Sequence, residues 1–64
     1  MKWEYNWNEE MNIYYVPRAA SICEARSREE AFKKKFGDDI EVFIVSPFEW
    51  SYISSRGKVE ILEE

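Results

Sequence analysis

The chain has 64 residues, a formal net charge of −4, no histidine and a single cysteine, Cys23, so an intramolecular disulfide is excluded. Its length allows one small core, and eleven aromatic residues supply much of the surface that such a core buries. We therefore expect a single domain over residues 1–64 whose stability depends on packed aromatic side chains.

The missing histidine removes the usual acid–base residue near neutral pH and the commonest metal ligand. Cys-His and Ser-His catalysis are therefore excluded. Asp38, Asp39 and Glu41 lack the spacing of a calcium loop, so a solvated turn is the simpler interpretation. We expect a protein that is not an enzyme and has no cofactor or metal site, and we interpret Cys23 as an inert buried thiol.

The start of the chain, Met1–Glu4, lacks the charged region and apolar run of a signal peptide. No segment reaches the length of a membrane-spanning helix. A lone cysteine fits a reducing compartment. These features favour a soluble, cytoplasmic protein without a membrane partner.

The first sixteen residues alternate large apolar and polar side chains with the period of two that is typical of a strand. A polar turn at residues 8–10 separates two such strands, and residues 11–16 form the second, which predicts a β-hairpin. Tyr14 and Val16 make the second face of this strand apolar too, so the register stays open. The buried face of the first strand is aromatic and consists of Trp3, Tyr5 and Trp7.

Pro17 has no N–H for a strand ladder, so it ends the second strand, bulges it or places it at an edge. Residues 19–25 show no helical stripe and either continue this strand or form a short separate one. Ser27 and Glu30 have the spacing of a capping box, which predicts that a helix begins there. Gly37 supplies its left-handed C-terminal cap.

The predicted helix has one apolar face, formed by Ala31, Phe32 and Phe36. The following stretch, Ile40–Val45, is apolar almost without interruption, which predicts a strand shielded on both faces and ended by Pro47. A single helix covers only one of these faces. The opposite face therefore requires cover from the aromatic strands or from a partner.

Two further strands are predicted at the C-terminal end. Phe48, Trp50 and Tyr52 alternate with polar residues, residues 54–57 have turn chemistry, and Lys58–Leu62 alternates again as a hairpin partner. The expected fold is α+β: a small antiparallel sheet of four to five strands with one helix packed on it, in the order β-β-α-β-β-β. Such a helix leaves some aromatic surface exposed.

Acidic charge is concentrated near the C-terminus, where residues 37–64 carry seven acidic and two basic side chains. This argues against direct nucleic-acid binding, which requires clustered Lys and Arg, and favours a basic partner. For the aromatic residues, core packing and a protein-binding patch are favoured over base stacking, because acidic, Asn and Ser side chains are interleaved with them. The predicted partner-binding residues are Asp38, Asp39, Glu41, Phe48, Glu49, Trp50 and Tyr52.

Three features follow one another in Ile22–Pro47: the helix start Ser27-Arg28-Glu29-Glu30-Ala31-Phe32, a glycine-containing turn and the strand Ile40–Pro47. In these features the segment resembles the small inhibitor of host RNA polymerase encoded by podophages. The resemblance implies an acidic domain of strands with one helix across them, which docks on the polymerase and blocks promoter DNA. The last strand of that family carries arginines for polymerase binding, whereas this chain has Ile44 and Ser46, so the resemblance extends to the class and not to the target.

The predicted function is a non-enzymatic inhibitor, encoded by a phage or mobile element, that docks on a host nucleic-acid-handling protein. Anti-CRISPR proteins and polymerase inhibitors belong to this class. The alternative is a small structural or assembly module that homodimerises through a strand edge or an aromatic face. A small enzyme or ligand-binding protein is least favoured, because no acid–base pair can be assembled.

Overall fold

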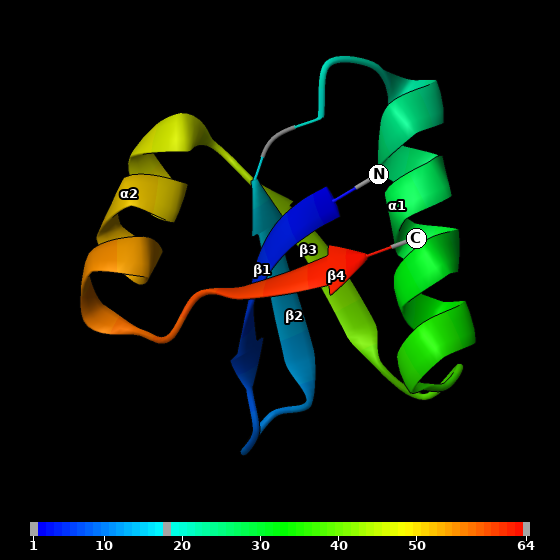
Figure 1. Ribbon diagram of the computed structural model, residues 1–64, viewed down its shortest axis with the longest axis horizontal. Helices are drawn as coiled ribbons and strands as arrows, with labels where there is room; N and C mark the ends of the chain where they lie inside the picture. Colours follow the sequence, from blue (N-terminus) through cyan, green and yellow to red (C-terminus); the bar gives the residue numbers. More distant parts are fainter. Residues whose placement is uncertain (1, 18, 64) are drawn as a thin grey trace.

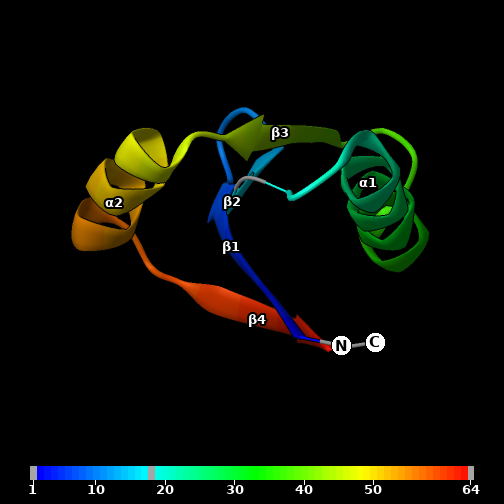
Figure 2. The same cartoon turned by 90° about the horizontal axis from the view of Figure 1, so that it is seen from above.

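The computed structural model describes residues 2–17 and 19–63, which form a four-stranded mixed sheet with one helix on each face (Figures 1 and 2). The strand order is β3-β2-β1-β4; β2 and β3 are parallel, and β1 is antiparallel to both β2 and β4. The predicted α+β class is confirmed. The predictions of a single helix, a possible fifth strand and a wholly antiparallel sheet are wrong. The elements are β1 (Lys2–Asn8), β2 (Ile13–Pro17), α1 (Ile22–Phe36), β3 (Glu41–Val45), α2 (Pro47–Arg56) and β4 (Glu60–Glu63).

The predicted hairpin is confirmed as β1 and β2, and its register assigns each side chain to a face of the sheet. Trp7 pairs with Tyr14, so the even-numbered residues of β2 lie on the same side as the aromatic residues of β1, beneath α1. Ile13 and Tyr15 lie on the opposite side, which α2 partly covers. Pro17 is the last residue of β2. Both faces of β2 are apolar because each lies beneath a helix.

Helix α1 begins earlier than predicted. Ser21 is its N-cap, and the Ser21 hydroxyl accepts the Glu24 N–H at 3.1 Å. Residues 21–30 therefore contain two Ser-x-x-Glu motifs, and the earlier one starts the helix while Ser27 lies within it. The prediction of a strand over residues 19–25 is therefore wrong. The helix ends as predicted at Gly37, which has the positive φ of 112° that glycine tolerates best.

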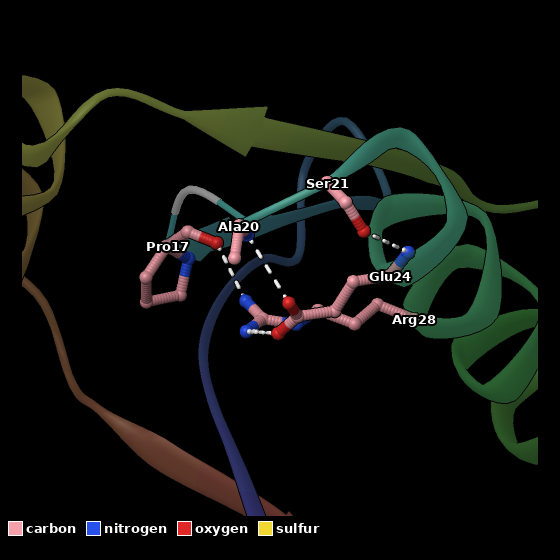
Figure 3. A network of polar contacts seen from close by, with 5 residues as sticks. All are labelled: Pro17, Ala20, Ser21, Glu24 and Arg28. Carbon is pink, nitrogen blue, oxygen red and sulfur yellow. Dashed lines mark hydrogen bonds and ion pairs between the residues drawn. The ribbon is translucent and has the colours of Figure 1, made fainter.

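Arg28 connects the start of α1 to the end of β2 (Figure 3). Its Nη1 donates to the Pro17 carbonyl at 2.7 Å, and its Nη2 donates to Glu24 Oε1 at 2.6 Å. Glu24 Oε2 accepts the Ala20 N–H at 3.1 Å. These hydrogen bonds, from Arg28 first and Ala20 second, lower the pKa of the Glu24 carboxyl. Because the guanidinium also lies 5.9 Å from the centre of the Trp3 ring, one side chain connects the helix, the connecting segment and the core.

The core lies between α1 and the sheet and is centred on Phe32, which is fully buried. Its ring centroid lies 5.2 Å from that of Tyr5 and 5.9 Å from that of Tyr14. Trp3 stacks on it with a centroid distance of 6.4 Å. Phe36 extends the cluster and stacks on Tyr14 at 4.7 Å. The predicted apolar face of the helix is therefore confirmed, and these aromatic residues stabilise the fold by packing.

The strand predicted over Ile40–Val45 is confirmed as β3, but it lies at an edge of the sheet and is not shielded on both faces. Its neighbour is β2, and α1 supplies the crossover that a parallel pair requires. On the α2 side of the sheet, Val45 is 6% exposed, whereas Phe43 is 46% exposed. Figure 2 shows β3 and β4 at the two margins of the sheet.

Residues 47–56 form α2 and not the predicted strand. Ser46 is the N-cap, and its hydroxyl accepts the Glu49 N–H at 3.3 Å and donates to Glu49 Oε1 at 3.2 Å. Pro47 occupies the first helical turn, where its missing N–H costs nothing. Gly57 ends the helix. The capping box and proline therefore prevail over the alternating aromatic pattern.

The last predicted strand is confirmed as β4, but it pairs with β1 and not with residues 50–54, because those residues are helical. Trp3 lies opposite Leu62 in this pair. The Asn6 side-chain amide donates to the Lys58 carbonyl at 2.9 Å and so fixes the segment that leads from α2 to β4. Gly57 permits this approach, because a Cβ there would collide with the Asn6 side chain.

Replacing Phe32 by alanine should lower the free energy of unfolding by about 3–5 kcal/mol, because it leaves a cavity in the aromatic core. Phe48→Ala is the matched control, since Phe48 is 89% exposed and its loss should change that free energy by less than about 0.5 kcal/mol. Urea unfolding followed by circular dichroism measures both. Equal effects of the two substitutions would contradict the assignment of the core.

Alkaline pH should destabilise the fold through its buried tyrosines. Burial raises the pKa of Tyr5 to about 12, and a hydrogen bond to Glu60 contributes to the same rise in pKa. Burial also raises the pKa of Tyr14. Unfolded tyrosines titrate near 10, so the free energy of unfolding keeps its full value below about pH 10 and falls as the pH rises toward about 12.

Urea unfolding at about pH 8 and about pH 11 measures this loss of stability. The variant Tyr5→Phe should lose less stability between the two conditions than the parent chain does. Tyr52→Phe, which changes an exposed tyrosine, should retain the full loss. An identical loss in Tyr5→Phe and the parent chain would disprove the role of Tyr5.

Candidate functional site

An open apolar groove lies between α2 and the sheet. It has a volume of about 480 Å³. One wall comes from β2 and the rest from α2, and a single charged side chain lies at its rim. We call it the α2 groove; its lining residues are Tyr15, Phe48, Glu49, Tyr52 and Ile53. A concave, largely apolar surface with few polar groups is the usual form of a binding site.

The helical spacing of α2 explains why aromatic side chains line this groove and yet face solvent. Trp50, Ile53 and Ser54 are half-buried and have the i, i+3, i+4 spacing of one helix face, which lies toward the sheet. Phe48 and Tyr52 are one turn apart on another side of the helix. They are 89% and 60% exposed. Exposed large aromatic side chains that lie together indicate an interaction surface.

Two charged groups flank the aromatic residues of the groove. Glu49 lies in the first turn of α2, where the Ser46 hydroxyl holds its carboxylate at 3.2 Å and the helix dipole favours its negative charge. Arg56 lies in the last turn, with its guanidinium carbon 4.7 Å from the centre of the Tyr52 ring. The groove can therefore accept an apolar side chain while Glu49 pairs with a cation.

Three of the predicted partner-binding residues, Phe48, Glu49 and Tyr52, come together in the α2 groove. Trp50 belongs to the same helix but lies on its half-buried inner face. The structure therefore brings together most of the α2 residues in the predicted set, although it places them on a helix and not on a strand.

The acidic residues of the predicted set lie elsewhere. Asp38 and Asp39 are exposed in the turn between α1 and β3, and Glu41 is the first residue of β3. Helix α2 follows the opposite end of β3, as Figure 1 shows. Five strand residues separate the two ends by about 16 Å. These three side chains therefore do not contribute to the groove.

Sequence reasoning missed two groove residues, Tyr15 and Ile53. Both faces of β2 are apolar, so the sequence left its register open and did not show that the face with Tyr15 lies toward a second helix. Ile53 follows Glu49 by four residues, so the two adjoin on a helix but not on a strand. The Ser46-x-x-Glu49 motif was the available signal, because it predicts the helix that brings these positions together.

Cys23 is exposed in the first turn of α1, so its interpretation as a buried thiol is wrong. Within residues 2–17 and 19–63, no three Asp, Glu or Cys side chains gather in a way that could hold a metal ion. In the same part of the chain, neither helix has the length and apolar character needed to span a membrane.

Comparisons with known protein families, with curated proteins and with solved structures find no match. The resemblance to podophage polymerase inhibitors therefore stays a prediction.

Replacing Ser46 by alanine should lower the free energy of unfolding by about 1 kcal/mol, because the N-cap of α2 is lost. Ser51→Ala, within the exposed part of the same helix, is the control and should leave stability unchanged or slightly higher. Urea unfolding measures the global effect, and hydrogen exchange at the amides of residues 50–56 measures the local one. Unchanged exchange in Ser46→Ala would contradict the cap.

Proposed function

We propose that the chain is a non-enzymatic protein-binding module that inhibits a nucleic-acid-handling protein, with the α2 groove as its main contact surface. The observation that supports this most strongly is the exposure of Phe48, at 89%, beside a groove that already contains Tyr52. An aromatic side chain held outward on a capped helix contributes little to folding. It is well placed to enter a pocket on a partner.

Aromatic side chains at the centre of an interface commonly contribute most of its binding energy. Each such residue typically weakens binding by about 2 kcal/mol or more when it is truncated. Because α2 is capped at both ends, the backbone that carries Phe48 and Tyr52 is already formed before binding, and less backbone entropy is lost on association. The inner wall, formed by Tyr15 and Ile53, can in turn accept an apolar side chain of the partner.

Charge favours a basic partner. On the α2 side of the sheet, Glu41 and Glu49 form no ion pair with any other described residue. Proteins that handle nucleic acids present Lys and Arg to the phosphate backbone. The groove presents one acid, Glu49, while the nearby Arg56 lies over the Tyr52 ring. Glu49 and the exposed aromatic side chains suit such a site, and occupying it would exclude the nucleic acid, which accounts for inhibition.

Asp38 and Asp39 have a different part in this proposal. They lie about 16 Å from α2, beyond the screening length of about 8 Å at physiological ionic strength, so they add little to contacts in the groove. Exposed charges at this distance mainly accelerate the encounter with an oppositely charged partner. Contact residues and steering residues can therefore be separated by kinetics.

The test begins with affinity capture from a bacterial lysate, after which the captured protein is purified and its binding is measured by surface plasmon resonance. Truncating both Phe48 and Tyr52 to alanine should raise the dissociation constant at least about 30-fold, mainly through faster dissociation. Reversing Asp38 and Asp39 to lysine should slow association and reduce its salt dependence, with dissociation unchanged.

Ile22→Ala is the matched control, because Ile22 is an exposed apolar residue on α1, away from the groove. It should leave both rate constants unchanged. Capture of a partner with no role in nucleic-acid metabolism would contradict the proposed target class. Full binding by the Phe48 and Tyr52 double variant would contradict the surface.

A further inference from the structure

We propose that two copies of this chain associate edge to edge through β3, as an antiparallel strand pair with a two-fold axis at Phe43. This surface adjoins the α2 groove, because the Phe43 ring centroid lies 6.1 Å from that of Tyr15, but no residue of β3 lines the groove. The inference does not depend on the proposed function. The occupant is a second copy because one two-fold register pairs the outward backbone groups of β3, brings together the two exposed Phe43 rings and keeps the Glu41 carboxylates apart.

The hydrogen-bonding direction of β3 is known from its first residue. The Glu41 N–H donates to the Asn12 carbonyl at 3.2 Å, so the backbone of Glu41 is directed toward β2. In a strand, the backbone groups of successive residues are directed alternately to the two sides. Phe43 and Val45 therefore also bond toward β2, whereas Val42 and Ile44 direct their N–H and C=O groups to the outer edge. Since β3 is last in the strand order, no described strand pairs with these groups.

An antiparallel pair centred on Phe43 places Val42 opposite Ile44 of the second copy, and Ile44 opposite Val42. Val42 and Ile44 are the residues whose backbone groups face outward. When two such residues lie opposite each other in an antiparallel pair, each N–H donates to the C=O of the other. Every outward N–H and C=O of β3 therefore acquires a partner. All five residues of each strand are paired in this register.

The side chains fit the same register. Phe43 lies opposite Phe43 of the second copy in a position without direct hydrogen bonds, where opposed side chains come closest. Their contact would bury two aromatic rings that are 46% exposed in the single chain. Glu41 lies opposite Val45 of the second copy, so the two Glu41 carboxylates are about 13 Å apart along the strands. Like charges therefore do not face each other across the axis.

The opposite margin of the sheet has protection that β3 lacks. β4 is only four residues long, and ion pairs flank it, with Lys2 Nζ 3.3 Å from Glu63 Oε1 and Lys58 Nζ 3.4 Å from Glu60 Oε1. Short length and charge are the usual means of preventing edge pairing. In β3, four consecutive apolar residues, Val42–Val45, follow a single acidic one, and there is no Lys, Pro or bulge.

Sedimentation velocity of the complete chain from about 10 μM to about 1 mM tests this, since association follows mass action. We expect a monomer–dimer equilibrium. Phe43→Lys and Phe43→Glu should each weaken dimerisation at least tenfold, because like charges then meet at the two-fold axis. An equimolar mixture of the two variants should recover the dimer as a heterodimer, which a purely structural role of Phe43 would not produce.

Val42→Pro is a second test, because it removes an outward N–H while leaving the ladder to β2 intact. It also removes a side chain that packs against the core, so circular dichroism is used to check that the variant is folded. The folded variant should dimerise at least tenfold more weakly than the parent chain. Ile61→Lys, on the α2 side of β4, is the matched control and should not change association.

A monomeric parent chain at every concentration, or a dimer that Phe43→Lys leaves intact, would overturn the proposal. Groove variants such as Phe48→Ala should dimerise normally, so failure here is distinguishable from failure of the proposed function.

Discussion

Strand β2 is apolar on both faces, and the arrangement of the whole chain follows from this constraint. Tyr14 and Val16 require cover on one side, and Ile13 and Tyr15 require it on the other. Helix α1 follows β2 directly, covers the first side and carries the chain to β3, which must then run parallel to β2. Helix α2 follows β3 and lies across the second side (Figure 2). The result is three layers built from short elements.

The two sides of the sheet are covered unequally, and the candidate function depends on this difference. α1 inserts the fully buried Phe32 into an aromatic cluster, so its side of the sheet forms the core. α2 has no fully buried residue and leaves the groove beside Tyr15. The aromatic residues that pack around Phe32 beneath α1 stabilise the fold, whereas Phe48 and Tyr52 on α2 are available to a partner.

Local patterns predicted the elements whose signals are local. The hairpin, the strand at β3 and the helix end at Gly37 follow from alternation and glycine chemistry. The alternation in residues 48–52 is ambiguous, because Phe48 and Tyr52 are also one helical turn apart, and the Ser46-x-x-Glu49 cap settles it. The edge position of β3 and the pairing of β4 with β1 have no local signal. Tyr15 joins the site only through packing between layers, so sequence reasoning found three of the α2 residues of the groove and missed Ile53 and the β2 wall.

The most direct test of this account is the hydrogen-exchange footprint of a bound partner on the chain. The partner obtained by affinity capture is added at saturation, and amide exchange is compared with that of the free chain. We expect added protection in residues 46–56 and at the adjoining end of β2, with α1 unchanged, because the incompletely covered side of β2 is the binding side. A footprint on the outer face of α1, with α2 exchanging as in the free chain, would contradict it.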